Sequence, residues 1–288
     1  MLYQLSYTPA GGRASIEGVP AWQATRGGPS WRTAMHAPAA KIIAPDLLLM
    51  AYRSGIFPMA DSRDDEDVYW VEPRERAVIP LDGLKVSRSL AKAVRQERFR
   101  VTCNADFDGV VAACAAPRPG HPESWISERI AASYRALHMA GHAHSIECWQ
   151  GDDLVGGLYG VGFDHAFCGE SMFSRATDAS KVALAWLVAL LRRSGYLLLD
   201  CQFMTGHLGS LGAVALSREA YLERLAEAVA AGPAPALPEA YASVLGEAEA
   251  LGVGEGLGVA VGVGASSSSA TGASSPGKLI LQSLTQTS

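Results

Sequence analysis

The sequence predicts an α+β fold in which a mixed sheet packs against several helices. Three patterns predict it: short runs that alternate apolar and polar residues, longer runs with apolar residues three and four apart, and one nearly continuous apolar run at 196–203. The continuous run is typical of a strand covered on both faces. The chain has 288 residues, of which 49% are hydrophobic and 18% charged, so it can build a sizeable core and global disorder is excluded.

The start of the chain predicts a small N-terminal α/β module over 1–83. Residues 1–40 contain paired glycines and show no sustained period of 2 or 3.6, so we expect poor order there. Residues 46–55 indicate a short helix that Gly55 ends, and a turn containing Pro58 follows.

Polar residues at helix starts locate the elements of the central domain, 84–230. Ser87 and Asp106 are expected to cap helices of about ten residues, and Ser127 opens a third. A strand is expected between the first two helices, over 99–103.

Three short alternating runs separated by two turn sequences predict an antiparallel meander. Asp178 then caps a long helix to about residue 194, the strand 196–203 follows, and Ser217 caps a last helix to about 230. The strands of the meander are expected over 145–149, 154–160 and 166–173.

Residues 231–288 differ in composition from the rest. Ten of these 58 residues are glycine and few are charged, so the segment cannot bury enough apolar surface to offset its chain entropy. A low-complexity, mostly disordered tail is therefore expected. A short helix over 238–251 is compatible with the pattern, and the apolar residues 279–281 are able to dock on a surface that the sequence does not identify.

Composition also narrows the cellular setting. No apolar run approaches the roughly 18–20 residues that span a bilayer, and the net charge of −5 argues against coating of nucleic acid by the whole surface. A cytoplasmic protein without a membrane span is expected. The five cysteines form no C-x-x-C pair and indicate reduced core residues: Cys103, Cys114, Cys148, Cys168 and Cys201.

A basic helix is the first candidate functional feature. Arg88, Lys92 and Arg95 stand at i, i+4 and i+7, which aligns three cations on one face, and Lys85 precedes them. Such a face suits phosphates, and an ordinary solvated helix face is the alternative.

Two strands carry polar residues in apolar surroundings. Glu170 interrupts an apolar strand, so its carboxylate is either paired at a strand edge or has a raised pKa suited to a base. Asp200 and Gln202 share one face at the end of the next buried strand, where α/β-type folds often place their sites. Simple capping residues are the alternative for this pair.

Several other kinds of site are disfavoured. Residues 169–173 lack the second glycine of a serine-hydrolase elbow, and the glycines of 156–162 fit neither a P-loop nor a dinucleotide fingerprint. His142 and His144 form an H-x-H pair with no obvious third ligand, which favours a structural turn, and no metal is expected.

Motifs in a fixed order and spacing run from about residue 45 to residue 230, and they resemble those of bacterial leucyl/phenylalanyl-tRNA–protein transferases. The Gly-Glu-Ser-Met-Phe-Ser block at 169–174 is highly specific in this company. The resemblance rests on residues 49–58, 69–70, 125–126, 134, 141–147, 154–161, 167–174, 179–181 and 200–202.

The resemblance implies a GNAT-type acyltransferase domain and an activity. The enzyme would move Leu, Phe or, less well, Met from aminoacyl-tRNA to the α-amino group of proteins that begin with Arg or Lys, marking them for degradation. No metal or organic cofactor is implied, because the donor ester is already activated. Coenzyme A is disfavoured, since residues 174–178 contain no glycine for a pyrophosphate loop. The likeness suggests a monomer.

The same resemblance assigns catalytic roles. Gln202, oriented by Asp200, would bind and polarise the reacting amine, while Glu170 would hold the basic acceptor or accept its proton. Proton transfer assisted by the substrate's own ribose oxygen is an equal alternative.

Binding residues follow from the resemblance as well. The terminal adenosine would lie near Trp70, Trp125 and Tyr134. The aminoacyl side chain would enter a pocket of Leu158, Phe167, Met172 and Leu199. The tRNA phosphates would contact Lys85, Arg88, Lys92 and Arg95.

Two other functions stay open. A GNAT-like domain that has lost catalysis would only bind tRNA or N-terminal Arg/Lys peptides, but the joint presence of Glu170, Asp200 and Gln202 argues against it. A leucyl transferase acting on N-terminal Asp or Glu would need a cation close to Glu170, and Arg175 and Lys181 are the candidates.

Overall fold

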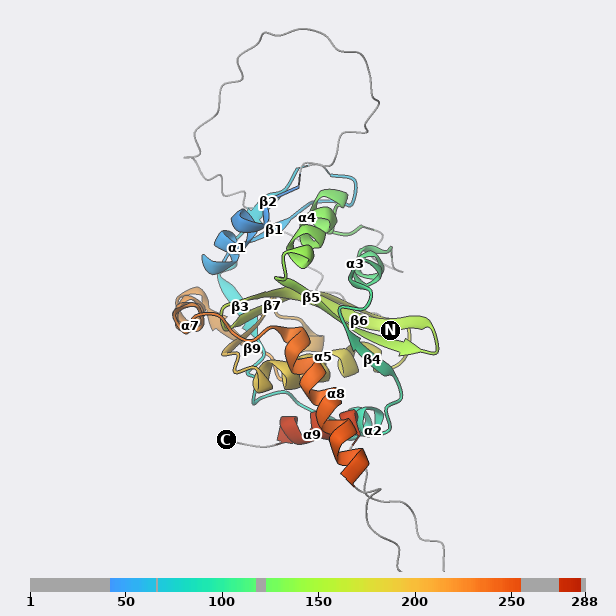
Figure 1. The fold of residues 1–288 in the computed structure, drawn as a ribbon. Helices are drawn as coiled ribbons and strands as arrows, with labels where there is room; N and C mark the ends of the chain where they lie inside the picture. Colours follow the sequence, from blue (N-terminus) through green and yellow to red (C-terminus); the bar gives the residue numbers. More distant parts are fainter. Residues whose placement is uncertain (1–41, 66, 118–122, 255–274, 286–288) are drawn as a thin grey trace, which may run out of the picture.

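The computed structural model describes residues 42–65, 67–117, 123–254 and 275–285 (Figure 1). Along the chain its elements are α1 (Pro45–Arg53), β1 (Phe57–Met59), β2 (Tyr69–Val71), β3 (Glu75–Val78), α2 (Arg88–Arg95), β4 (Arg100–Cys103), α3 (Phe107–Ala115), α4 (Glu128–Met139), β5 (Ala143–Gln150), β6 (Asp153–Phe163), β7 (Ala166–Ser174), α5 (Ala179–Arg193), β8 (Leu198–Gln202), α6 (Gly206–Ser210), β9 (Val214–Ser217), α7 (Arg218–Ala230), α8 (Leu237–Gly254) and α9 (Pro276–Thr285).

The main sheet has seven strands in the order β4-β5-β6-β7-β8-β3-β9. All neighbours are antiparallel except β7 and β8, which are parallel and joined by the crossover helix α5. The predicted mixed sheet and the antiparallel meander β5-β6-β7 are confirmed. Strands β1 and β2 form a separate two-stranded sheet.

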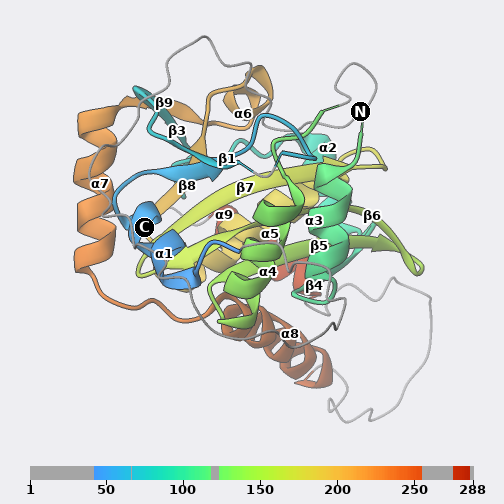
Figure 2. The same cartoon turned by 90° about the horizontal axis from the view of Figure 1, so that it is seen from above.

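Helices cover both faces of the main sheet. Helices α2, α5, α8 and α9 lie on one face, and α1, α3 and α4 lie on the other (Figures 1 and 2). Successive strand residues face opposite sides, so the core divides into two clusters. For example, Leu158 of β6 belongs to the cluster on the α5 side, and its neighbour Tyr159 belongs to the cluster on the α1 and α4 side.

Four predicted helix caps are confirmed, because each side chain accepts a hydrogen bond from a backbone N–H of the first turn: Ser87, Asp106, Ser127 and Ser217. Asp178 precedes α5 as expected but makes no capping bond. Its backbone is left-handed, with φ of 69°, and its carboxylate pairs with Lys181 at 3.0 Å. The side chain is thereby turned away from the orphan N–H groups.

Two segments beyond residue 230 are helices, α8 and α9, so the expectation of a mostly disordered tail is wrong for them. The short helix compatible with 238–251 is confirmed within α8, which buries Leu237 and Val244 in the cluster on the α5 side. The apolar residues 279–281 lie in α9, which buries Leu279 and Ile280 in the same cluster. Alanine in α8 resembles low complexity, but alanine is the best helix former. Residues 1–41 and 255–274 lie outside the described part of the chain.

Strand β3 lies inside the expected N-terminal module, 1–83, yet it pairs with β8 and β9 in the main sheet. The expected boundary at residue 83 therefore assigns one strand of the main sheet to the N-terminal module. The sequence does not show β3 as a strand, because the charged residues Glu75 and Arg76 interrupt any apolar pattern there. Arg76 is nevertheless buried, since it forms an ion pair with Asp200. None of the described helices is both long enough and apolar enough to cross a bilayer.

Candidate active site

Glu170 occupies a β-bulge in β7. Tyr159 of β6 pairs with Ser171. The next residue of β6, Gly160, pairs with Gly169, which leaves Glu170 as the extra residue. A bulge re-aims a side chain and turns two successive residues toward one face. The Glu170 carboxylate consequently points to the face that α1 and α4 cover.

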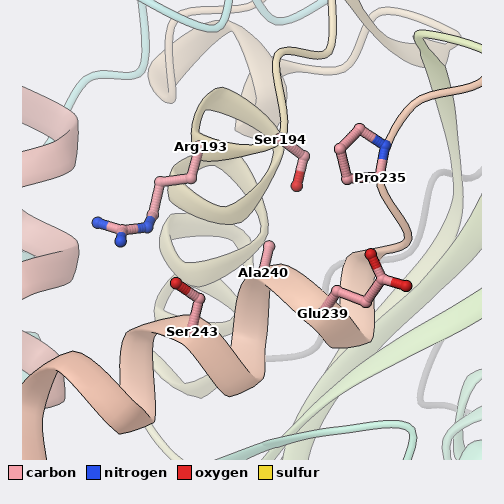
Figure 3. Close-up of a pocket in the computed structure, with 6 residues that line it drawn as sticks. All are labelled: Arg193, Ser194, Pro235, Glu239, Ala240 and Ser243. Atoms are coloured by element: carbon pink, nitrogen blue, oxygen red, sulfur yellow. The ribbon is translucent and has the colours of Figure 1, made fainter.

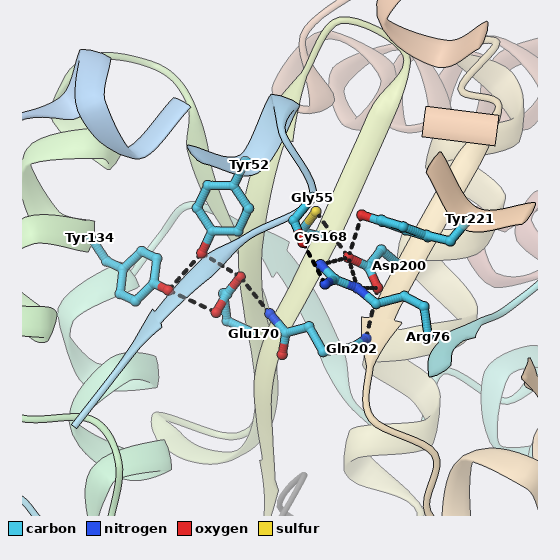
Figure 4. A network of polar contacts seen from close by, with 9 residues as sticks. All are labelled: Tyr52, Gly55, Arg76, Tyr134, Cys168, Glu170, Asp200, Gln202 and Tyr221. Carbon is cyan, nitrogen blue, oxygen red and sulfur yellow. Dashed lines mark hydrogen bonds and ion pairs between the residues drawn. The ribbon is translucent and has the colours of Figure 1, made fainter. Parts of the chain in front are cut away.

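The Glu170 carboxylate is fully buried and accepts hydrogen bonds from three neutral groups (Figure 4). The Tyr52 hydroxyl on α1 lies 2.7 Å from Oε1, and the Tyr134 hydroxyl on α4 lies 2.8 Å from Oε2. The two hydroxyls are 2.6 Å from each other. The side-chain amide of Gln202 donates to Oε1 at 2.9 Å, which joins β7 to β8.

Burial raises the pKa of Glu170 to about 7, because a charged carboxylate is poorly solvated in this position. Hydrogen bonds from Tyr52, Tyr134 and Gln202 oppose this increase, and the negative charge of Asp200 adds slightly to it. A carboxyl group with such a pKa can gain or lose a proton near neutral pH, as a general acid or base must.

Asp200, two strand positions before Gln202, has a different environment (Figure 4). Arg76 forms a two-pronged ion pair with it, with Nε 2.9 Å from Oδ1 and Nη2 2.7 Å from Oδ2. Tyr221 on α7 donates at 3.1 Å and the Cys168 thiol at 3.4 Å. The backbone N–H of Gln202 donates to Oδ1 at 2.7 Å. All of its oxygen acceptor positions are directed at protein groups.

Arg76 is 2% exposed and lies between two aromatic rings. Its guanidinium carbon is 4.7 Å from the ring centre of Phe57 and 4.5 Å from that of Tyr221. Burial opposes its charge, but the nearby Asp200 carboxylate outweighs burial and raises the pKa of Arg76 above its usual value. Sequence reasoning missed Arg76, and the only signal was a cation directly before the apolar residues 77–79.

Gln202 connects the two carboxylates. Its backbone has φ of 63°, an uncommon left-handed conformation for a residue with a side chain. The bond from its N–H to Asp200 holds that conformation, and its amide then reaches Glu170. Asp200 therefore contacts Gln202 through the backbone rather than through the side chain.

The four residues expected to form an aminoacyl pocket are all buried on the α5 side of the sheet: Leu158, Phe167, Met172 and Leu199. Glu170 and Asp200 face the other side. The two sets are adjacent where β7 and β8 separate, because their pairing ends at Cys168 and Asp200 while β7 continues to Ser174.

The other expected contacts are spread over the fold. Tyr134 is completely buried, whereas Trp70 and Trp125 are half-buried beside the α1 and α4 cluster. The cations of the basic helix are exposed on and just before α2: Lys85, Arg88, Lys92 and Arg95. Helix α2 packs on the α5 side through Leu90, Ala93 and Val94.

The H-x-H pair shows no metal-site geometry. His144 is buried and lies 3.0 Å from the Asn104 amide, and burial lowers its pKa to about 4. Among the described residues no group of three or more His, Cys, Asp or Glu side chains is arranged to hold a metal. Figure 3 shows a surface pocket between α5 and α8, lined by Arg193, Ser194, Pro235, Glu239, Ala240 and Ser243, which shares no residue with the network of Figure 4.

The chain is similar to known proteins over most of its length. A family model described as leucyl/phenylalanyl-tRNA protein transferase matches residues 78–226, and one for the N-terminal domain of that protein matches residues 42–74. A relative of that name from Novosphingobium aromaticivorans is 57% identical over 255 residues, 85% of this chain and 97% of its own. One from Rhizorhabdus wittichii is 60% identical over 185 residues, 64% of this chain and 75% of its own. One from Zymomonas mobilis is 57% identical over 188 residues, 65% of this chain and 70% of its own.

Proposed function

The chain belongs to the leucyl/phenylalanyl-tRNA–protein transferase family and is an aminoacyltransferase, and on that premise we propose its acceptor, its site and its mechanism. It transfers Leu or Phe, and less well Met, from aminoacyl-tRNA to the α-amino group of proteins that begin with Arg or Lys. The product is marked for degradation through its new N-terminus. The protein acts in the cytoplasm as a monomer, and its catalytic domain is of the GNAT type.

The observation that carries this proposal is the pairing of Glu170 with Gln202 across two adjacent parallel strands. One is a carboxylate with a pKa near neutrality, and the other an amide held in a fixed direction by Asp200. This combination suits a reaction between an amine and an ester, in which the nucleophile must lose a proton and needs orientation.

In the proposed reaction the acceptor amine attacks the ester carbonyl carbon of the aminoacyl-tRNA. A C–N bond forms, and the C–O bond to the terminal ribose breaks. The amine gives up one proton and the ribose oxygen gains one, so the step needs no external acid or base overall. The side-chain oxygen of Gln202 orients the amine, and Glu170 either takes its proton or holds the basic side chain of the acceptor.

We assign the donor to the point where the pairing of β7 with β8 ends, beyond Cys168 and Asp200. An aminoacyl group inserted there has its carbonyl near Glu170 and Gln202 and its side chain on the α5 side, among apolar residues. Leucine, methionine and phenylalanine side chains fit a pocket of Leu and Met, which adapts in shape. The residues assigned to this pocket are Leu158, Phe167, Met172 and Leu199.

The 3′ end and the acceptor stem of the tRNA contact surfaces outside the sheet. The half-buried rings of Trp70 and Trp125 offer stacking faces to the terminal adenosine, and Tyr134 lines the same side. The exposed cations Lys85, Arg88, Lys92 and Arg95 contact phosphates. Replacing Lys92 and Arg95 with Ala should weaken tRNA binding and flatten its salt dependence by about two counterions.

An acceptor beginning with Asp or Glu is less compatible with the site. Such an acceptor needs a cation near Glu170, yet the two candidates have other partners. Arg175 donates to the Leu154 carbonyl at 3.0 Å, and Lys181 pairs with Asp178. Arg76 is likewise engaged by Asp200.

The test is transfer of radiolabelled leucine from Leu-tRNA to peptides that differ only in an N-terminal Arg, Lys or Asp. Label is expected on the Arg and Lys peptides, and it should be strongly reduced by Glu170→Gln and by Gln202→Ala. Glu223→Gln, on the exposed side of α7, serves as the matched control. Transfer to the Asp peptide alone, or tRNA binding without transfer, would refute the proposal.

A further inference from the structure

Three oxygen–oxygen contacts form a closed triangle in the site (Figure 4). Glu170 Oε1 lies 2.7 Å from Tyr52 Oη, Tyr52 Oη lies 2.6 Å from Tyr134 Oη, and Tyr134 Oη lies 2.8 Å from Glu170 Oε2. Each distance is that of an O–H···O hydrogen bond. Each such bond requires its own proton.

The two phenols supply only two protons, since a tyrosine hydroxyl has a single hydrogen. If both phenols donate to an ionised Glu170, the contact between Tyr52 and Tyr134 brings two oxygens together without a proton between them. A third proton removes this conflict, and the only remaining place for it in the triangle is the carboxyl group.

Gln202 determines which carboxyl oxygen carries that proton. Its amide donates to Oε1, which also accepts from Tyr52, so Oε1 serves as the carbonyl oxygen. The proton then lies on Oε2 and is donated to Tyr134, which reverses the direction that this contact has when the carboxylate is ionised. Tyr134 donates to Tyr52, and Tyr52 donates back to Oε1, which makes the ring consistent.

We infer that Glu170, Tyr52 and Tyr134 form a closed hydrogen-bond ring that keeps Glu170 protonated in the ligand-free site, and that a cationic acceptor must expel this proton when it binds there. The inference rests on the proposed acceptor role of Glu170. It adds Tyr52 to the site as a positioning residue, and it makes acceptor binding a proton-releasing event. The released proton passes to solvent.

The other groups around Glu170 support a neutral carboxyl. Tyr159 on β6 and Cys168 on β7 are buried beside Glu170, and neither side chain can carry a positive charge that would stabilise the carboxylate. Asp200 carries negative charge on β8, and the nearby cation Arg76 is committed to it. Burial itself raises the pKa of Glu170 to about 7. Burial and Asp200 therefore outweigh the hydrogen bonds from Tyr52, Tyr134 and Gln202, which favour the charged form.

The ring and independent hydrogen bonds predict different results for one substitution. If the phenols only donate to an ionised carboxylate, Tyr52→Phe removes one charge-assisted bond from the charged form, and the pKa of Glu170 rises by about one to two units. In the ring, the same change removes two neutral bonds from the protonated form and one charge-assisted bond from the charged form. Because a charge-assisted bond is about twice as strong as a neutral one, these losses nearly cancel, and the pKa of Glu170 stays within about half a unit of its wild-type value.

The test is an NMR titration of the ligand-free protein labelled with [δ-13C]glutamate. The Glu170 signal is identified by its loss in Glu170→Gln, whose amide also completes the ring and so preserves the fold. An unchanged or lower pKa is expected in both Tyr52→Phe and Tyr134→Phe, while a rise of about one unit or more would overturn the ring. This titration needs no substrate, so it stands even if the proposed acceptor is wrong.

Proton release is measured by calorimetry of an Arg-initiated peptide at pH 6 in two buffers of different ionisation enthalpy. About one proton should be released by wild type and none by Glu170→Gln. If the peptide binds to wild type without releasing a proton, acceptor binding is not coupled to deprotonation of Glu170, and that part of the inference is overturned. Absence of any binding would instead refute the acceptor role, leaving the titration to decide the ring.

Discussion

Glu170 and Asp200 are two buried carboxylates on neighbouring parallel strands, and they differ in the charge of their partners. Two phenols and an amide, all neutral, surround Glu170. A guanidinium holds Asp200, together with a phenol, a thiol and a backbone N–H. Burial alone therefore does not decide what a carboxylate does. With a charged partner it is a fixed anchor, and with neutral partners it can exchange a proton near pH 7.

The largest effect is expected from breaking the anchor. Asp200→Asn leaves the Arg76 guanidinium buried without a counter-charge, so the free energy of unfolding should fall by about 3–5 kcal/mol. Urea unfolding measures this. Asp152→Asn, an exposed carboxylate in the turn before β6, is the matched control and should change stability by less than about 0.5 kcal/mol. A loss near 1 kcal/mol for Asp200→Asn would mean that the ion pair is not an anchor.

The opposite pattern is expected for Glu170→Gln, because glutamine keeps the shape and the hydrogen bonds but cannot exchange a proton. Transfer measured as kcat/KM should fall by about 100-fold or more, while stability at pH 6 stays within about 1 kcal/mol of wild type. Near-normal transfer by a folded Glu170→Gln enzyme would show that Glu170 is not the base. The remaining mechanism would then be proton transfer assisted by the substrate's own ribose oxygen.

The pH dependence of stability should differ between wild type and Glu170→Gln. The pKa of Glu170 is about 7 in the folded protein and 4.5 ordinarily, so the folded state binds the proton more tightly than the unfolded chain. Stability that Glu170 contributes is thus complete below pH 4.5 and is lost as pH rises through 7. Relative to Glu170→Gln, wild type should lose about 2–3 kcal/mol between pH 4.5 and 8. A flat difference across this range would show that Glu170 titrates normally.

The smallest effect is expected from trimming the anchor without breaking it. Tyr221→Phe removes one hydrogen bond of 3.1 Å to Asp200 but keeps the aromatic ring over Arg76. Stability should fall by about 1 kcal/mol, measured by urea unfolding. Its effect on kcat should disappear in a Gln202→Ala background if Asp200 acts on catalysis through Gln202. Fully additive effects would count against that connection.

Much of the fold could be predicted because its signals are local. Four serine and aspartate caps lie at the positions expected, and the meander follows from alternation and turn residues. Errors arose where tertiary contacts overrule composition. Helices α8 and α9 pack against α5, a contact that the glycine-rich composition of 231–288 does not reveal, although the pattern at 238–251 was compatible with a helix.

Only part of the site could be predicted from the sequence, because some of its residues are recognisable only through their tertiary contacts. Glu170, Asp200 and Gln202 are polar residues in apolar strands, an anomaly that can be seen without a structure. Arg76 and Tyr52 carry no such mark, because a cation and a phenol near the N-terminus are ordinary until their partners are known. Their partners lie 124 and 118 positions away along the chain.

The contribution of α7 to the Asp200 anchor has a consequence for synthesis on the ribosome. Tyr52 and Arg76 emerge early, but the anchor is complete only when Tyr221 has left the exit tunnel. At 5–20 residues per second, that delay is on the order of 10–30 s. A nascent chain that ends before Tyr221 already contains Glu170 and Gln202 and still lacks the finished anchor. The last hydrogen bond of the anchor is therefore made after every other residue of the network has been synthesised.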